Sequence, residues 1–165
     1  MRIIKVISGG QTGADMGGLL AARDCGVETG GMAPFGWRDE TGSNPLLESF
    51  GLTMHPSRHY LPRTECNVMD SHITVIFGRC TSPGCQATIN FCWHYKRPFV
   101  LCHWNSKDGL TDATHEQLAA YIVAALRRFD EDIIVNVAGN RESTNPGIEA
   151  VTRRTMELVI QRVNS

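Results

Sequence analysis

Short apolar runs alternate with amphipathic stretches along most of the chain. The runs that predict β-strands are 3–8, 27–33, 73–77, 99–102 and 133–137. The stretches that predict helices are 13–25, 62–71, 83–95, an apolar stripe over 118–126 and a last segment that starts at 145. Strands that are apolar throughout and separated by helices are typical of a parallel sheet covered on both faces. The pattern therefore predicts an α/β fold, a three-layer sandwich with a mainly parallel central sheet and helices on both faces.

Special residues indicate where the predicted helices begin and end. Gly26 is suited to close the first helix. Ser82 followed by Pro83 is the pattern of a helix cap and a first helical position. We expect the remaining helices to start at Pro62, at a capping box formed by Thr114 and Gln117, and at Asn145-Pro146. Residues 34–57 are rich in proline and glycine and predict a long irregular segment, which in compact domains is often functional.

Length and charge limit the classes of protein that need consideration. A chain of 165 residues fits one domain, residues 1–165. A net charge of −1 provides no overall field that would attract nucleic acid or a membrane surface. No apolar run approaches the length of a membrane span. The stretch Met1–Lys5 is the start of a strand rather than a signal peptide, so we expect a cytoplasmic protein.

The thiols and imidazoles do not form a recognisable metal or catalytic motif. None of the six cysteines is spaced as C-x-x-C, and reduced thiols are the expectation in the cytosol. The six histidines form no H-x-x-x-H pair on a predicted helix, which disfavours structural zinc, and the sequence identifies no metal ligands. A helix start would lower the pKa of Cys85. A cysteine that packs as a small apolar group is the more common case.

The turn after the first strand is rich in glycine. It reads Ser8-Gly9-Gly10-Gln11-Thr12-Gly13-Ala14-Asp15. Glycines let the backbone approach a ligand closely, and the free N–H groups of a helix start favour an anion. We therefore predict a phosphate or oxyanion site formed by Gly9, Gly10, Gln11, Thr12, Gly13 and Asp15. A tight turn without a ligand is the alternative, and Asp15 could equally order the loop. The turn lacks the P-loop lysine and the first glycine of the dinucleotide fingerprint.

Two further polar segments follow predicted strands. Ligands of such sheets bind outside the carboxyl ends of the strands, so these segments should lie near the glycine turn. Arg141 could supply a bidentate charge to the same anion. We predict that Thr81, Ser82 and Gly84, together with Asn140, Arg141, Glu142 and Ser143, complete the binding site. Ordinary capping by Ser82 and a solvated Arg141 are the alternatives. Thr64, Asn67 and Ser71 share one helix face and either line a pocket or face water.

Several segments resemble the molybdenum carrier family, whose members are also called molybdenum cofactor carrier proteins. The segments are Ile7–Asp15, Gly30-Gly31 with Pro34, Arg63–Ser71, and Asn136–Ser143 with Pro146-Gly147. They run through nearly the whole chain in the expected order. The resemblance implies a Rossmann-like domain in the clan of the lysine-decarboxylase-like proteins and the cytokinin-activating phosphoribohydrolases. It also implies binding of molybdenum cofactor, a pterin phosphate that holds the metal through a dithiolene.

The chain departs from the phosphoribohydrolases at their catalytic position. Those enzymes use P-G-G-x-G-T-x-x-E, with the glutamate as catalytic acid. Phe91 stands at that position here if Thr88 is the motif threonine. Ser82-Pro83-Gly84 also replaces the Gly-Gly-Thr that carrier proteins often have, which leaves the anion contacts of this loop open.

The resemblance and this departure favour a binding protein over an enzyme. We expect no catalytic residues and storage or delivery of molybdenum cofactor. We expect the ligand to be a phosphorylated pterin or another anionic small molecule, and molybdoenzymes to be the recipients. Apolar groups on more than one face of two helices, namely Met16, Leu19, Phe91, Trp93 and Tyr95, predict a homo-oligomer. The alternative is a nucleotide-binding protein or a nucleotide N-glycosidase of the phosphoribohydrolase kind.

Overall fold

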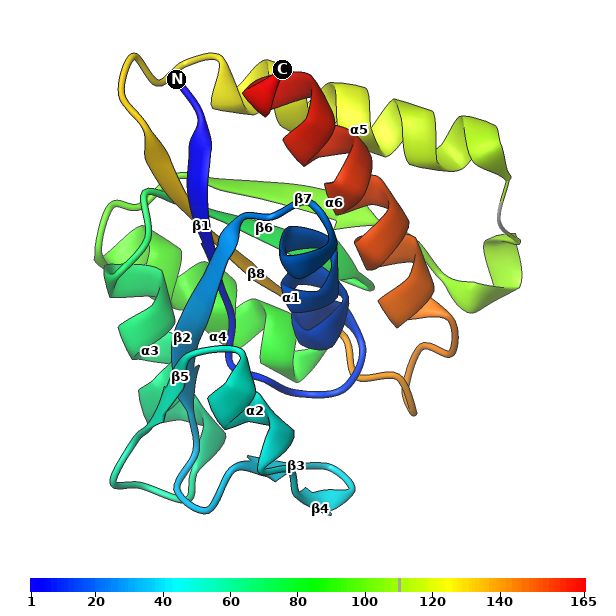
Figure 1. Cartoon of the computed structure of the whole chain (residues 1–165). Coiled ribbons are helices and arrows are strands. Elements are labelled where there is room, and N and C mark those ends of the chain that lie inside the picture. Colours follow the sequence, from blue (N-terminus) through cyan, green and yellow to red (C-terminus); the bar gives the residue numbers. More distant parts are fainter. Residues whose placement is uncertain (110) are drawn as a thin grey trace.

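A six-stranded sheet forms the centre of the computed structural model, which describes residues 1–109 and 111–165 (Figure 1). Its strands are β1 (Ile3–Ile7), β2 (Glu28–Ala33), β5 (Leu52–Met54), β6 (Ile73–Gly78), β7 (Phe99–His103) and β8 (Ile133–Gly139). They lie in the order β5-β2-β1-β8-β6-β7, and every neighbouring pair runs parallel. The last strand, β8, therefore lies between β1 and β6. The carboxyl ends of these three strands meet in the middle of one edge.

Helices cover both faces of the sheet, which confirms the predicted three-layer α/β fold (Figure 1). One face carries α1 (Ala14–Asp24), α5 (Asp112–Leu126) and α6 (Ile148–Asn164), and the other carries α3 (Tyr60–Met69) and α4 (Pro83–His94). A short 3-10 helix, η1 (Ser106–Asp108), precedes α5. The main hydrophobic core lies between the sheet and α1, α5 and α6. Every residue of β6 is buried, as the sequence pattern indicated for a central strand.

The segment 34–57 is more regular than its composition predicted. It contains an antiparallel hairpin of β3 (Arg38–Asp39) and β4 (Gly42–Ser43), a single-turn helix α2 (Leu46–Ser49) and the edge strand β5. The prediction of a wholly irregular loop is wrong because elements of two to four residues are too short to show a hydrophobic period. Leu47, Phe50 and Leu52 pack with Leu19 of α1 in a second small core.

Three helix starts differ from their predictions. Helix α3 begins at Tyr60, so Pro62 is its third residue, where a missing N–H costs nothing because the first turn has no intrahelical acceptors. Helix α5 is capped by Thr111, whose hydroxyl accepts the Thr114 N–H at 3.3 Å, rather than by a capping box at Thr114. Helix α6 begins at Ile148.

Asn145 does not cap α6 because its side chain is buried and used elsewhere. Its amide oxygen accepts the Ser106 N–H at 2.9 Å, and its amide nitrogen donates to the Trp104 carbonyl at 3.0 Å. By contrast, the predicted cap of α4 is confirmed, since the Ser82 hydroxyl accepts the Cys85 N–H. Among the described residues, no helix is both long enough and apolar enough to cross a membrane.

Candidate functional site

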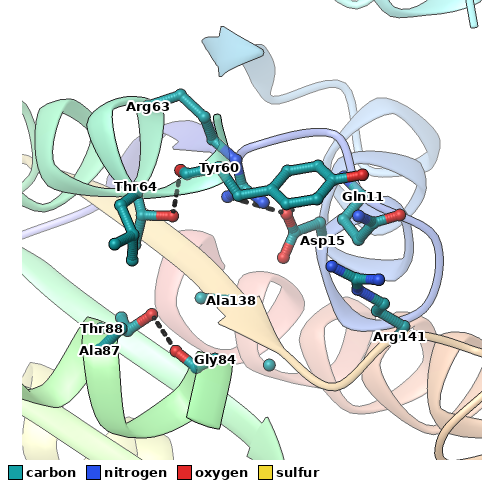
Figure 2. A pocket seen from close by; sticks show the side chains of 12 residues that line it. Gln11, Asp15, Tyr60, Arg63, Thr64, Gly84, Ala87, Thr88, Ala138 and Arg141 are labelled. Atoms are coloured by element: carbon teal, nitrogen blue, oxygen red, sulfur yellow. Dashed lines mark hydrogen bonds and ion pairs between the residues drawn. The ribbon is translucent and has the colours of Figure 1, made fainter. Parts of the chain in front are cut away.

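A small pocket opens at the carboxyl ends of the central strands, between the glycine turn, α3 and the start of α4 (Figure 2). Its volume is about 100 Å³. It is lined by Gln11, Asp15, Tyr60, Leu61, Arg63, Thr64, Gly84, Ala87, Thr88, Ala138, Gly139 and Arg141. This is the edge of the sheet at which the sequence placed the site. The pocket combines residues from four segments that are far apart in the chain.

A buried ion pair forms the back of the pocket. Arg63 Nη1 of α3 lies 3.5 Å from Asp15 Oδ2 of α1, and both side chains are almost fully buried. Burial raises the pKa of the Asp15 carboxyl, while Arg63 and the Gln11 N–H offset part of that effect. Burial likewise lowers the pKa of the Arg63 guanidinium, and Asp15 opposes it. The pair therefore places both a carboxyl group and a guanidinium at the pocket.

Four N–H groups of the glycine turn are already paired within the chain, those of Gly10, Gln11, Thr12 and Ala14. The Gln11 N–H donates to Asp15 Oδ2 at 3.1 Å, so the Asp15 carboxylate occupies the position that the sequence analysis gave to a ligand anion. The N–H groups of Gly10, Thr12 and Ala14 donate to Ser8 Oγ at 3.2 Å, Gln11 Oε1 at 3.0 Å and the Asn140 carbonyl at 3.1 Å, respectively. In this conformation these four N–H groups are occupied, and the turn contributes the side chains of Gln11 and Asp15 to the pocket lining.

The glycines of the turn make room for groups of the protein itself. A Cβ atom on Gly9 would stand 1.8 Å from Arg63 Nη1, because the guanidinium of Arg63 lies against this residue. A Cβ atom on Gly13, whose φ is 83°, would stand 2.4 Å from the Asn140 carbonyl oxygen. The predicted close approach to the backbone is thus made by Arg63 and by the segment after β8.

Three guanidinium groups surround the ring of Tyr60 at the first turn of α3. The Cζ atoms of Arg141, Arg38 and Arg63 lie 4.9, 5.6 and 5.7 Å from the ring centroid. Cations at these distances interact favourably with an aromatic face. Arg141 comes from the segment after β8 and Arg38 from the β3–β4 hairpin, so the cluster joins three parts of the chain. It gives the pocket and its mouth a local positive charge that the net charge of the chain conceals.

Two nitrogen atoms of the lining residues have no hydrogen-bond partner among the described residues. They are Arg63 Nε and Gln11 Nε2, and both are buried. A buried donor that lacks an acceptor costs about 1–3 kcal/mol, and native proteins contain few of them. Both atoms belong to residues that line the same pocket. This coincidence indicates that the pocket accepts hydrogen-bond acceptors of a ligand.

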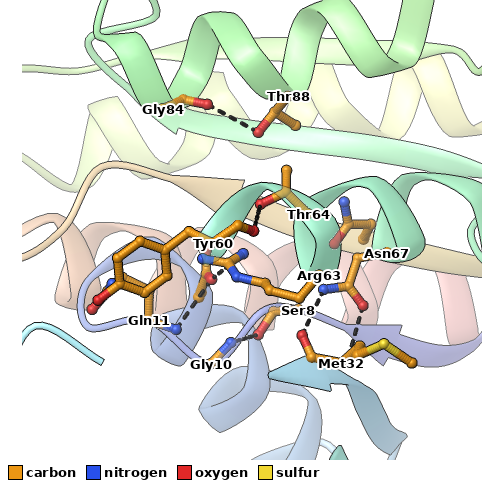
Figure 3. Close-up of polar contacts among 12 residues, drawn as sticks. Ser8, Gly10, Gln11, Met32, Tyr60, Arg63, Thr64, Asn67, Gly84 and Thr88 are labelled. Atoms are coloured by element: carbon orange, nitrogen blue, oxygen red, sulfur yellow. Dashed lines mark hydrogen bonds and ion pairs between the residues drawn. The ribbon is translucent and has the colours of Figure 1, made fainter. Parts of the chain in front are cut away.

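The structure brings four of the predicted binding residues to the pocket, namely Gln11, Asp15, Gly84 and Arg141. Of the α3 face considered in the sequence analysis, only Thr64 lines it (Figure 2). Asn67 instead pairs with the backbone of Met32 in β2, at 2.9 and 3.0 Å (Figure 3). Ser71 is buried and donates to the Val68 carbonyl.

Other predicted binding residues have structural partners beside the pocket. The Glu142 carboxylate accepts the N–H groups of Gly147 at 2.6 Å and Glu149 at 3.0 Å, so it caps α6. Asn140 is buried, accepts the Arg79 N–H at 2.6 Å and donates to Ser82 Oγ at 3.0 Å. Thr81 is exposed and does not line the pocket. Gly9, Gly10 and Gly13 shape the turn, and the hydroxyls of Thr12 and Ser143 both donate to Glu40.

Sequence reasoning missed Tyr60, Arg63 and Arg38. The one signal for Arg63 was its place at the start of the segment Arg63–Ser71 that resembles the molybdenum carrier family. Tyr60 lies in the irregular connection that precedes the predicted helix, and Arg38 lies in the segment expected to be a loop. Their convergence depends on how α3 and the hairpin pack onto the sheet, which a single sequence pattern does not contain.

Neither Cys85 nor Phe91 gives the pocket a catalytic group. Cys85 is buried, and burial raises the pKa of its thiol instead of lowering it, so the activated thiol considered above is wrong. Phe91 lies on α4 but not in the pocket lining. The pocket does contain one carboxyl group, that of Asp15. Within residues 1–109 and 111–165 no cluster of three or more His, Cys, Asp or Glu side chains could hold a metal ion.

The fold and the pocket define a Rossmann-like α/β protein whose candidate site lies at the carboxyl ends of the central strands. The chain belongs to the circularly permutated YpsA SLOG family, whose model matches residues 6–160. A crystal structure described as that of a putative molybdenum carrier protein from Syntrophus aciditrophicus is similar. The two chains are 31% identical with a TM-score of 0.77, over 96% of this chain and 95% of that one. No curated protein matches the sequence. The family resemblance predicted from the sequence is confirmed.

Proposed function

We propose that this protein binds molybdenum cofactor, or a closely related phosphorylated pterin, and stores or delivers it without transforming it. The observation that carries the proposal is the pair of buried, unpartnered donors, Arg63 Nε and Gln11 Nε2, in a pocket edged by Arg141. Such donors suit the oxygen atoms of an anionic ligand. The name of the similar protein from Syntrophus aciditrophicus supports the choice of cofactor.

The size of the pocket suits the head group of this ligand rather than the whole molecule. The pocket volume of about 100 Å³ suits a small group such as phosphate. Arg141 and the first turn of α4 at Gly84 would hold that group, since an N-terminal helix turn favours anions. The flat pterin would then lie across Tyr60 at the mouth, where Arg38 adds a further cation.

The proposal is tested by identifying the small molecules that copurify with the protein from its native cell. We expect mass spectrometry to find a phosphorylated pterin or its oxidation products, and elemental analysis to find molybdenum, with the wild-type protein. Both should be lost from the Arg141→Ala variant and retained by Arg127→Ala, which removes one exposed cation at the end of α5. Copurification of nucleotides alone would contradict the proposal.

A nucleotide N-glycosidase is the second candidate, and one observation favours it. Asp15 places a carboxyl group in the pocket, and burial raises its pKa, which is the direction required of a general acid. The hydrogen bond from the Gln11 N–H and the contact with Arg63 oppose this because both stabilise the carboxylate. We therefore favour binding without hydrolysis. We further propose that the protein forms homo-oligomers in the cytoplasm and that molybdoenzymes receive its cargo.

A further inference from the structure

The β3–β4 hairpin is tied to the pocket by one carboxylate. Glu40, in the turn of the hairpin, accepts hydrogen bonds from the hydroxyls of Thr12 and Ser143. It also accepts the Ser143 N–H at 3.2 Å. Thr12 belongs to the glycine turn and Ser143 to the segment after β8, the two segments that carry Gln11 and Arg141. The Glu40 carboxylate thus bridges two sides of the pocket.

The surroundings of Glu40 are those of an anion site. Three donors converge on its two oxygen atoms, and Arg141 is close enough to act on its charge. Burial alone would raise the pKa of Glu40. The hydrogen bonds from Ser143 and Thr12, with Arg141, outweigh it and hold the pKa below its usual value. The group is therefore a carboxylate at neutral pH, and the same donors could serve a phosphate or another oxyanion.

The Glu40 carboxylate supplies the side-chain hydrogen bonds that tie the hairpin to Thr12 and Ser143. The hairpin's other side-chain hydrogen bonds among the described residues are local: Thr41 and Asn44 donate to Asp39, and Ser43 donates to the Gly36 carbonyl. The Glu40 N–H adds one contact to the glycine turn, to Gln11 Oε1 at 2.8 Å. Each strand of the hairpin has only two residues, and both residues of β4 are exposed. A ligand group that replaces the carboxylate therefore needs to move only a short, peripheral element.

We propose that Thr12 and Ser143 form a second anion subsite, in which Glu40 is an internal occupant that a charged group of the ligand displaces. This inference rests on the proposed function, because it adds a contact for the same anionic ligand. It assigns the protein a ligand with two separate anionic groups, one in the pocket and one at Thr12 and Ser143. The Glu40 carboxylate then leaves this subsite when the ligand binds, while Arg38 keeps its place over the Tyr60 ring at the mouth of the pocket.

The experiment measures the affinity for inorganic phosphate by calorimetry. Removing a like charge and freeing the hydroxyl donors should make Glu40→Ala bind phosphate about tenfold more tightly than wild type. Adding Ser143→Ala to Glu40→Ala should abolish the gain. Glu48→Ala, which removes an exposed carboxylate of α2, controls for the change in net charge and should bind as wild type does. Glu40→Gln, with the same side-chain length, should give a smaller gain.

Two results would overturn the second subsite. One is a folded Glu40→Ala protein that binds phosphate no more tightly than wild type. The other is a gain that persists in the double variant, because it would come from the lost charge alone. The main pocket is tested separately, since binding of a phosphorylated pterin by wild type does not depend on either result. If Glu40→Ala binds phosphate more tightly than wild type, but wild type binds no phosphorylated pterin, the second subsite is supported and the proposed cargo is refuted.

Discussion

At the scale of single residues, Arg141 is the predicted binding residue whose position in the structure agrees best with a ligand role. Its guanidinium lies 4.9 Å from the Tyr60 ring centroid and lines the pocket. The Arg141 carbonyl accepts the Thr144 hydroxyl and the Asn145 N–H, whereas no hydrogen bond or ion pair engages the guanidinium among residues 1–109 and 111–165. Its side chain therefore contributes little to the fold and is available for an anion.

Arg141→Ala should weaken binding of a phosphorylated pterin by about 1.5–3 kcal/mol, the range for hydrogen bonds to charged groups. The melting temperature of the free protein should stay within a few degrees of wild type. Arg141→Lys should restore only part of the affinity, because lysine lacks the planar fork of arginine. Titration followed by pterin fluorescence measures each affinity, with Arg127→Ala as the control. Equal affinities of wild type and Arg141→Ala would remove this residue from the site.

Asp15 decides between the binding protein and the glycosidase. Arg63 and the Gln11 N–H stabilise its carboxylate, and Phe91 of α4 stands at the position of the phosphoribohydrolase acid if Thr88 is the motif threonine. We therefore expect no release of free adenine from AMP above background, measured by chromatography. Turnover near 1 per second, a rate typical of enzymes, would contradict the carrier proposal. If Asp15→Asn then abolished that turnover while the protein stayed folded, Asp15 would be identified as the catalytic acid.

At the scale of elements, the requirement for glycine at position 9 of the turn comes from α3, because the Arg63 side chain of that helix packs against this position. The methyl group in Gly9→Ala would overlap the Arg63 guanidinium and separate it from Asp15. Breaking a buried ion pair typically costs about 3–5 kcal/mol, and we expect a loss of that size in the free energy of unfolding. Gly84→Ala is the matched control, since its Cβ atom meets nothing within 4 Å. Its stability should change by no more than about 1 kcal/mol.

Denaturant titration of the two variants measures this difference. A Gly9→Ala protein as stable as Gly84→Ala would show that Arg63 can move without cost, and the ion pair would lose its structural role. A loss of stability accompanied by a loss of pterin affinity would show that the turn and α3 build the site together.

Elements of five or more residues could be predicted from the hydrophobic pattern, whereas the hairpin, α2 and β5 could not. The sequence also located the edge of the sheet at which Gln11, Asp15 and Arg141 meet, because the carboxyl ends of parallel strands converge there. The sequence did not reveal that the Asp15 carboxylate accepts the Gln11 N–H, or that Arg63 of α3 forms an ion pair with Asp15. Those contacts depend on helix packing across the sheet. The periodicity of α3 gives its buried face but not the residues it covers.

At the scale of the whole molecule, the fold moves the surface expected to self-associate away from α1 and onto α4 and β7. Leu19 is fully buried and Met16 half-buried, both against the core formed by α2 and β5, so α1 needs no partner subunit. Trp93 of α4 remains 70% exposed. Its ring meets Phe99 edge-on at 5.6 Å, next to the exposed Leu101 of the edge strand β7. This apolar edge is where we expect self-association.

Light scattering at micromolar concentration should give the mass of a dimer or larger assembly for wild type and of a monomer for Trp93→Ser. Tyr121→Ser, which removes an exposed aromatic ring from α5, should keep the wild-type mass. Lys96, Arg97 and Arg128 border the Trp93 surface. A symmetric contact there brings like charges together, so moderate salt should strengthen the association by screening them. A wild-type monomer, or an assembly that keeps its mass in Trp93→Ser, would exclude this edge as the interface.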